Sequence, residues 1–210
     1  MDRADIERLA SQVLEAHACH TAILYGSHAR GQATANSDVD LLCVRDHGPA
    51  VRDARLVDGV YLDAFVYPES AFDTLEPSLL RIAGGIVLRE RDGFGAALLG
   101  RVQALHERGP EPLRDDERQV LSVWSEKMLV RCRTLRGAEA DYRRMTLLVR
   151  SLEDYFALRN RWFRGEKEAF TWLREHDPQT HSLFERALKP NATEDALQDL
   201  IHAVYGSTPQ

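Results

Sequence analysis

The segment YGSHARGQATANSDVDLLCV, residues 25–44, constrains the fold most, because it joins two short apolar runs through a turn. The first run, TAILY (21–25), stops at Gly26-Ser27, which predicts a buried strand closed by a tight turn. The second run, DVDLLCV (38–44), predicts another strand. Side chains at i and i+2 of a strand point to the same face, so we expect Asp38 and Asp40 to project side by side.

Two neighbouring carboxylates repel, and without a counter-charge one of them is expected to take up a proton. A divalent cation removes this repulsion, and hard oxygen ligands suit Mg²⁺. A third strand is predicted over VYLDAFVY (60–67), where strand propensity disfavours Asp63. If this strand lies beside 38–44, three carboxylates meet on one patch, and such a patch can hold two metal ions.

Each aspartate taken singly also has a structural explanation. Asp38 could cap a turn after Asn36-Ser37, and Asp63 could be a charged residue that protects an edge strand. The neighbouring turn at Gly26-Ser27 favours a functional explanation for the group of aspartates over these structural ones. Its exposed backbone N–H groups, the missing side chain of Gly26 and the hydroxyl of Ser27 make an anion site beside the acids.

Together these residues resemble a known signature. The pattern G-S-x-A-R-G-x5-S-D-x-D-L fits residues 26–41 at every fixed position and is similar to that of the polymerase-beta-like nucleotidyltransferase superfamily, in its minimal branch. The resemblance covers residues 1 to about 95. It implies an α/β (α+β) fold with a mixed sheet and flanking helices, and transfer of a nucleoside monophosphate from an NTP to a hydroxyl with release of pyrophosphate.

The resemblance also implies residue roles and two Mg²⁺ ions. The metal ligands and catalytic carboxylates would be Asp38, Asp40 and Asp63, and Asp63 would either take the proton of the hydroxyl or only bind metal. Gly26 and Ser27 would hold the triphosphate. Arg30 would reach a phosphate or steady the loop, and a plain surface arginine is the alternative.

The sequence changes character at Gly109-Pro110-Glu111-Pro112, which predicts a linker between a nucleotidyltransferase domain (1–108) and a C-terminal helical bundle domain (109–210). The bundle loosely resembles the C-terminal bundles of aminoglycoside nucleotidyltransferases. Apolar periodicity predicts an N-terminal helix over 4–18 and bundle helices over 115–136, 138–163, 167–176, 183–188 and 194–205.

Two basic features of the helical half could bind phosphate. From Arg131 to Arg164 the chain has nine arginines against four acids, which is either a solvated helical surface or a cradle for a phosphate-bearing ligand. Lys167 resembles the lysine that contacts the nucleotide's phosphates in adenylyltransferases of the streptomycin-spectinomycin type. A solvated lysine in the first turn of a helix is the alternative.

Composition excludes several classes. With 44% hydrophobic and 29% charged residues in 210, the chain is ordinary for a globular protein, and its net charge of -6 argues against holding long nucleic acid by charge. We find neither a signal-peptide core nor an apolar run of about 18 residues. The three cysteines fit neither a disulfide framework nor a zinc motif. A cytoplasmic protein without a membrane partner is expected.

The expected activity is therefore Mg²⁺-dependent transfer of AMP from ATP, or of another NTP's monophosphate, to a hydroxyl of a small molecule. An aminoglycoside-like acceptor would make it an antibiotic-resistance enzyme, and a homodimer is plausible by family analogy. The alternatives are an antitoxin-type adenylyltransferase that modifies a partner protein and a non-catalytic nucleotide-binding protein. The partner of such antitoxins is usually a toxin that carries an R-x4-H ribonuclease motif. In this chain Arg101 and His106 fit that motif, but they lie outside the main bundle. The run Arg159–Arg164 has an arginine where the histidine should be.

Overall fold

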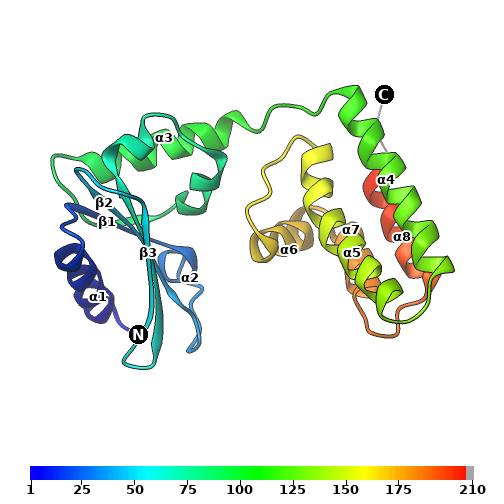
Figure 1. Cartoon of the computed structure of the whole chain (residues 1–210), viewed down its shortest axis with the longest axis horizontal. Coiled ribbons are helices and arrows are strands. Elements are labelled where there is room, and N and C mark those ends of the chain that lie inside the picture. The colour runs from blue at the N-terminus through cyan, green and yellow to red at the C-terminus, as the bar shows by residue number, and fades with distance from the viewer. Residues whose placement is uncertain (207–210) are drawn as a thin grey trace. The chain divides into compact units, whose positions relative to one another are not determined.

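The computed structural model describes residues 1–206 and divides the chain into two compact units, Met1–Arg108 and a second that begins at Gly109 (Figure 1). The first unit contains a five-stranded sheet and the second is helical. This architecture confirms the expected fold class of a mixed sheet with flanking helices, followed by an all-α region. No helix within residues 1–206 is long and apolar enough to cross a membrane.

The sheet of the first unit is mixed. Its strand order is β3-β4-β2-β1-β5, in which β2 and β4 are parallel and the other neighbours are antiparallel. The strands are β1 (Thr21–Tyr25), β2 (Val39–Arg45), β3 (Val51–Val57), β4 (Val60–Pro68) and β5 (Ile86–Arg89). β2 begins one residue later than the sequence predicted, so Asp38 lies just before the strand rather than in it.

The alternation of β4 separates the two faces of the sheet. Leu62, Ala64 and Val66 are buried in a core shared with α1 (Arg3–Ala16). Asp63 and Phe65, at the intervening positions, therefore point to the opposite face. The elements that pack on part of that opposite face are η1 (Glu69–Phe72), η2 (Pro77–Ile82) and α3 (Phe94–Arg108).

The sequence pattern predicts no strand between β2 and β4, and this prediction is wrong, because β3 lies there. β3 pairs with β4 through a two-residue turn, Asp58-Gly59, in which both residues have positive φ, 52° and 81°. An Asp-Gly turn of this kind favours a hairpin whose twist matches its strands. β4 thus has a neighbour on each side, and the explanation of Asp63 as an edge-strand residue is wrong.

The second unit consists of helices around an apolar core that includes Leu147, Tyr155 and Phe184. Its helices are α4 (Asp115–Thr134), α5 (Ala138–Leu158), α6 (Glu166–His176), α7 (Pro178–Ala187) and α8 (Glu194–Tyr205). α7 begins earlier than predicted, because the Asp177 side chain caps it by accepting from the Thr180 N–H and Pro178 suits a first helical position.

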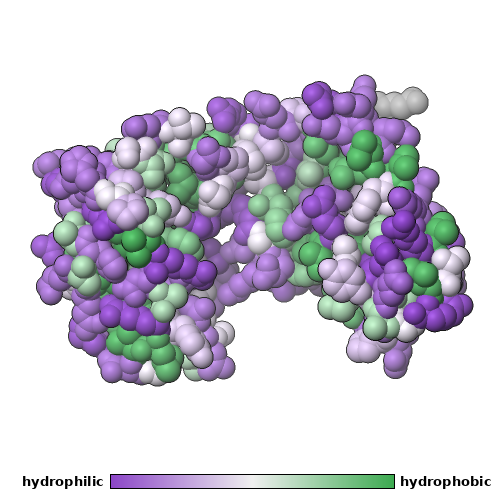
Figure 2. Space-filling model, in the orientation of Figure 1, coloured by the Kyte–Doolittle hydropathy of each residue, from purple (hydrophilic) through white to green (hydrophobic). Residues whose placement is uncertain are grey.

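The helical unit leaves a set of apolar side chains exposed. Figure 2 shows such residues on the visible face over α4. The exposed set on α4 and α5 is Val120, Val123, Val130, Tyr142, Met145 and Val149. Single exposed apolar residues are normal, whereas α4 and α5 each carry three of them.

Candidate active site

The parallel pairing of β2 and β4 makes Asp40 and Asp63 direct Cα partners. Both residues lie on the sheet face opposite α1, and both are half-buried. Asp38 is exposed two residues before Asp40, and its charge acts on the Asp40 carboxylate. The structure therefore brings together the three aspartates that sequence analysis singled out.

The electrostatics of this group centre on Asp40. Burial, together with the nearby carboxylates of Asp38 and Asp63, raises the pKa of Asp40 to about 6. Arg30 and Arg81 act in the opposite direction without cancelling the effect. Ionised Asp40 is thus disfavoured by burial and by two neighbouring carboxylates, and a divalent cation bound to its oxygens would relieve both effects.

The turn before the acids is built against Asp40. Gly26 has φ +70°, and a Cβ on it would overlap the Oδ2 atom of Asp40. Only glycine satisfies both the backbone and the contact. α2 (Gly26–Ala29) is a single turn that begins at the glycine itself.

Ser27 and Arg30 belong to the same turn. The Ser27 carbonyl accepts from the Gln32 N–H at 2.9 Å, and the Arg30 N–H donates to the Gly26 carbonyl at 3.3 Å. These bonds hold the loop closed after α2. The Arg30 side chain lies close enough to lower the pKa of Asp40.

Two arginines that sequence analysis missed complete the site. Arg52 of β3 donates to both oxygens of Asp63, from Nε to Oδ1 and from Nη2 to Oδ2, each at 2.7 Å. Arg81 of η2 lies over the Phe65 ring, with its Cζ 4.2 Å from the centroid, and donates to the Tyr67 hydroxyl at 3.0 Å. The Asp58-Gly59 turn signal could have revealed β3, and with it Arg52.

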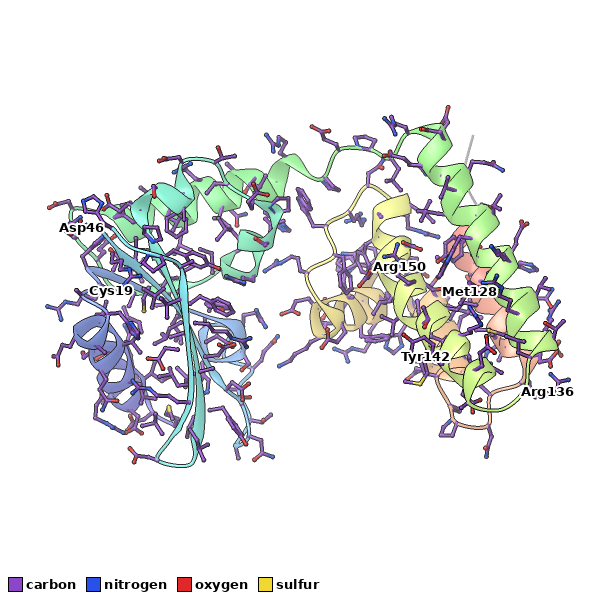
Figure 3. The ribbon with its side chains drawn as sticks, in the orientation of Figure 1. Cys19, Asp46, Met128, Arg136, Tyr142 and Arg150 are labelled. Atoms are coloured by element: carbon purple, nitrogen blue, oxygen red, sulfur yellow. The ribbon has the colours of Figure 1, made fainter. Side chains whose placement is uncertain are left out.

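The basic features of the helical half lie on the second unit. Lys167 is exposed in the first turn of α6. Within the arginine-rich stretch, Arg144 donates to the Ala187 carbonyl at 2.8 Å and Arg159 to that of Ala203 at 3.0 Å. Figure 3 shows Arg136 at the end of the α4–α5 hairpin and Arg150 along α5. Spread over the bundle in this way, the stretch fits a helical surface better than one phosphate cradle.

A second group of metal-ligand types lies past the end of β2. One ligand atom each from His20, Asp46 and Glu69 lies within 4.8 Å of the others. Arg91 pairs with both Asp46 and Glu69 and supplies their counter-charge. Figure 3 places Asp46 where β2 leaves the sheet, several residues along the strand from Asp40.

Arg101 of the R-x4-H match has a structural partner. Its Nη2 donates to the Phe72 carbonyl at 2.7 Å and to the Asp73 carbonyl at 3.3 Å. These bonds tie α3 to the end of η1 within the first unit. The match therefore has an explanation in folding alone.

Comparison with known proteins adds to this geometry. Residues 6–77, which include all three aspartates, match the family model "Nucleotidyltransferase domain". No curated protein matches the chain. Among solved structures, it is similar to a nucleotidyltransferase-like protein from Exiguobacterium sibiricum 255-15, with 15% identity, a TM-score of 0.43 and coverage of 94% of this chain and 75% of that one.

Proposed function

Because residues 6–77 form a nucleotidyltransferase domain of the polymerase-beta-like superfamily, we propose that the protein transfers AMP from ATP to a hydroxyl of a small-molecule acceptor and releases pyrophosphate. One observation carries this proposal. Asp40 and Asp63 are direct partners on adjacent parallel strands, and Asp40 also lies against the turn at Gly26. The acids thus lie beside a turn whose backbone N–H groups would bind phosphate, which supports a role in nucleotidyl transfer.

The acids fit divalent cations. All three candidate ligands offer hard carboxylate oxygens, and burial together with the carboxylates of Asp38 and Asp63 raises the pKa of Asp40. We assign Asp38, Asp40 and Asp63 as the residues that would hold two Mg²⁺ ions. Bound there, the ions would supply charge neutralisation for the phosphates and activation of the attacking hydroxyl.

Other residues of the chain would bind the phosphates and align the acceptor. The Gly26-Ser27 turn, with Arg30, would orient the β and γ phosphates by donating hydrogen bonds. Lys167 would add a positive charge to the phosphates, a role that rests on the resemblance of its sequence context. Asp63 would align the acceptor hydroxyl for in-line attack on the α phosphate, either as a metal ligand or as the base that takes its proton.

The proposal also covers the acceptor, the cellular location and the oligomeric state. An aminoglycoside-like acceptor, and with it a resistance function, is supported only by the likeness of the helical region to the bundles of such enzymes. A cytoplasmic location is supported by three free cysteines. A homodimer is supported by the exposed apolar residues of α4 and α5, and size-exclusion chromatography with light scattering would test it.

The decisive experiment offers the full chain each α-labelled NTP with Mg²⁺, together with aminoglycosides, hydroxylated metabolites and a protein extract. A labelled small molecule, formed only without EDTA and not by Asp40→Asn, is the expected result. A labelled protein would instead support the antitoxin-type alternative. Nucleotide binding without any labelled product would favour a non-catalytic nucleotide-binding protein and overturn the proposed transfer.

A further inference from the structure

The ion pair between Arg52 and Asp63 places a cation where the proposed function needs a metal ion. Both guanidinium contacts are 2.7 Å and occupy both carboxylate oxygens. This two-point arrangement is the strongest geometry that an arginine forms with a carboxylate. The charge of Asp63 is therefore already paired with that of Arg52.

Arg52 is placed so that it can leave. It lies on β3, the edge strand of the sheet, and 60% of its side chain is exposed, against 20% for that of Asp63. Because most of the Arg52 side chain is exposed, water can solvate the guanidinium once the pair opens, which lowers the free energy needed to break it. A cation bound to an Asp63 oxygen would also repel the guanidinium at this short range.

The surroundings of Arg52 suit a phosphate once the ion pair opens. Its Cζ lies 5.1 Å from the centroid of the Phe65 ring, and Arg81 lies over the same ring. A guanidinium on an aromatic ring keeps its hydrogen-bond donors available at the ring's edge. Two arginines on Phe65 therefore form a basic patch directly beside the acids.

We propose that Arg52 is an internal counter-cation of the site: a divalent cation displaces it from Asp63, and the freed guanidinium then binds a phosphate of the nucleotide. The inference rests on the proposed function, because it takes Asp63 to be a metal ligand. It predicts that Arg52 weakens metal binding when nucleotide is absent and strengthens nucleotide binding when metal is present.

The test measures Mn²⁺ binding to the full chain without nucleotide, by isothermal titration calorimetry. Arg52→Ala should bind Mn²⁺ about threefold to tenfold more tightly than the parent, and Arg52→Lys should lie between them. The control is Arg55→Ala, on the same strand, because Arg55 pairs with Asp53, which faces α1. In the Asp63→Asn background, Arg52→Ala should have no effect on Mn²⁺ binding.

A second measurement follows a non-hydrolysable ATP analogue with Mg²⁺. Arg52→Ala should raise its Kd about tenfold, as expected for the loss of one arginine–phosphate contact. Unchanged Mn²⁺ affinity in Arg52→Ala overturns the counter-cation role, and unchanged analogue affinity overturns the phosphate role, while the proposed function survives both. If Mn²⁺ binds equally to the parent and to Asp40→Asn, the metal site and the proposed function fail together.

Discussion

Gly26 and Asp40 touch across the β1–β2 pair, because the carboxylate of Asp40 occupies the space that a side chain at position 26 would need. Tyr25, the residue before the glycine, is the direct Cα partner of Asp40. The turn and the acid are thus fixed by the same pair of strands. A substitution of Gly26 should therefore alter the position of the Asp40 carboxylate.

Gly26→Ala should abolish nucleotidyl transfer and destabilise the protein by more than about 2 kcal/mol, since it adds a clash with Asp40 to the strain of a positive φ. Gly31→Ala is the matched control. Gly31 has φ +68° with open space around it, so it reports the backbone strain alone, about 1 kcal/mol. Urea denaturation measures the stability of the two variants, and the labelled-NTP assay measures their activity. Equal losses in the two variants would contradict the contact.

Asp40→Asn should stabilise the metal-free protein at neutral pH while removing activity. The folded-state pKa of Asp40, about 6, lies above its ordinary 3.8, so ionisation opposes folding and stability falls as pH rises between these values. At pH 7.5 with EDTA we expect a gain of about 1–3 kcal/mol, because each tenfold change in proton affinity corresponds to about 1.4 kcal/mol and solvent screening reduces the sum. Below pH 4 the gain should vanish.

The control for this pH dependence is Asp58→Asn, because the Asp58 side chain is 71% exposed in the β3–β4 turn. Its unfolding free energy should differ little from the parent's at both pH values. A stabilisation by Asp40→Asn that is equal at pH 3.5 and pH 7.5 would show that charge is not its cause.

Lys167→Ala should lower kcat/KM for the nucleotide about tenfold or more if this lysine contacts phosphate, because one charge-assisted contact is lost. Lys167 is exposed, so its removal should leave the melting temperature unchanged. Lys189→Ala, another exposed lysine of the helical unit, is the control. Identical kinetics for the parent and both variants would leave Lys167 as an ordinary surface residue.

Tyr205→Phe should destabilise the helical unit by about 1–3 kcal/mol. The Tyr205 hydroxyl donates to Asp154 at 2.7 Å, and Asp154 is 4% exposed, with its pKa raised by burial. The loss should be larger at pH 7.5 than at acid pH, where a protonated Asp154 needs the donor less. Tyr142→Phe, at a side chain that is 71% exposed, should change stability little. Equal losses in both variants would argue against the buried bond.

The sequence predicted the strands that are apolar and buried. β1, β2 and β4 are found within a residue or so of their expected bounds, because their side chains pack on at least one covered face. β3 escaped notice because most of its residues are exposed, as expected of a charged edge strand. α3 is absent from the predicted helices because its glycines weaken the helical pattern. One of them, Gly95, is needed where the helix packs against Thr21 and Val87.

The candidate site likewise has features that could be predicted from the sequence and features that could not. Its aspartates could be predicted because motif spacing and strand periodicity are local properties of the chain. The pairing of Asp40 with Asp63 depends on a parallel register between strands that are not adjacent in sequence. The contact of Arg52 with Asp63 depends on β3, and that of Arg81 with Phe65 on the path of η2. Neither contact is encoded in a short motif.

The parallel pairing of β2 with β4 runs without a break from Val39↔Leu62 to Arg45↔Pro68. The spacing of the two carboxylates is therefore set by main-chain hydrogen bonds and not by the packing of neighbouring side chains. A slip of one residue would turn Asp63 into the apolar core and bring Leu62 opposite Asp40. The connection over residues 46–50 lies outside this ladder, so an insertion there should leave the distance between the two acids unchanged.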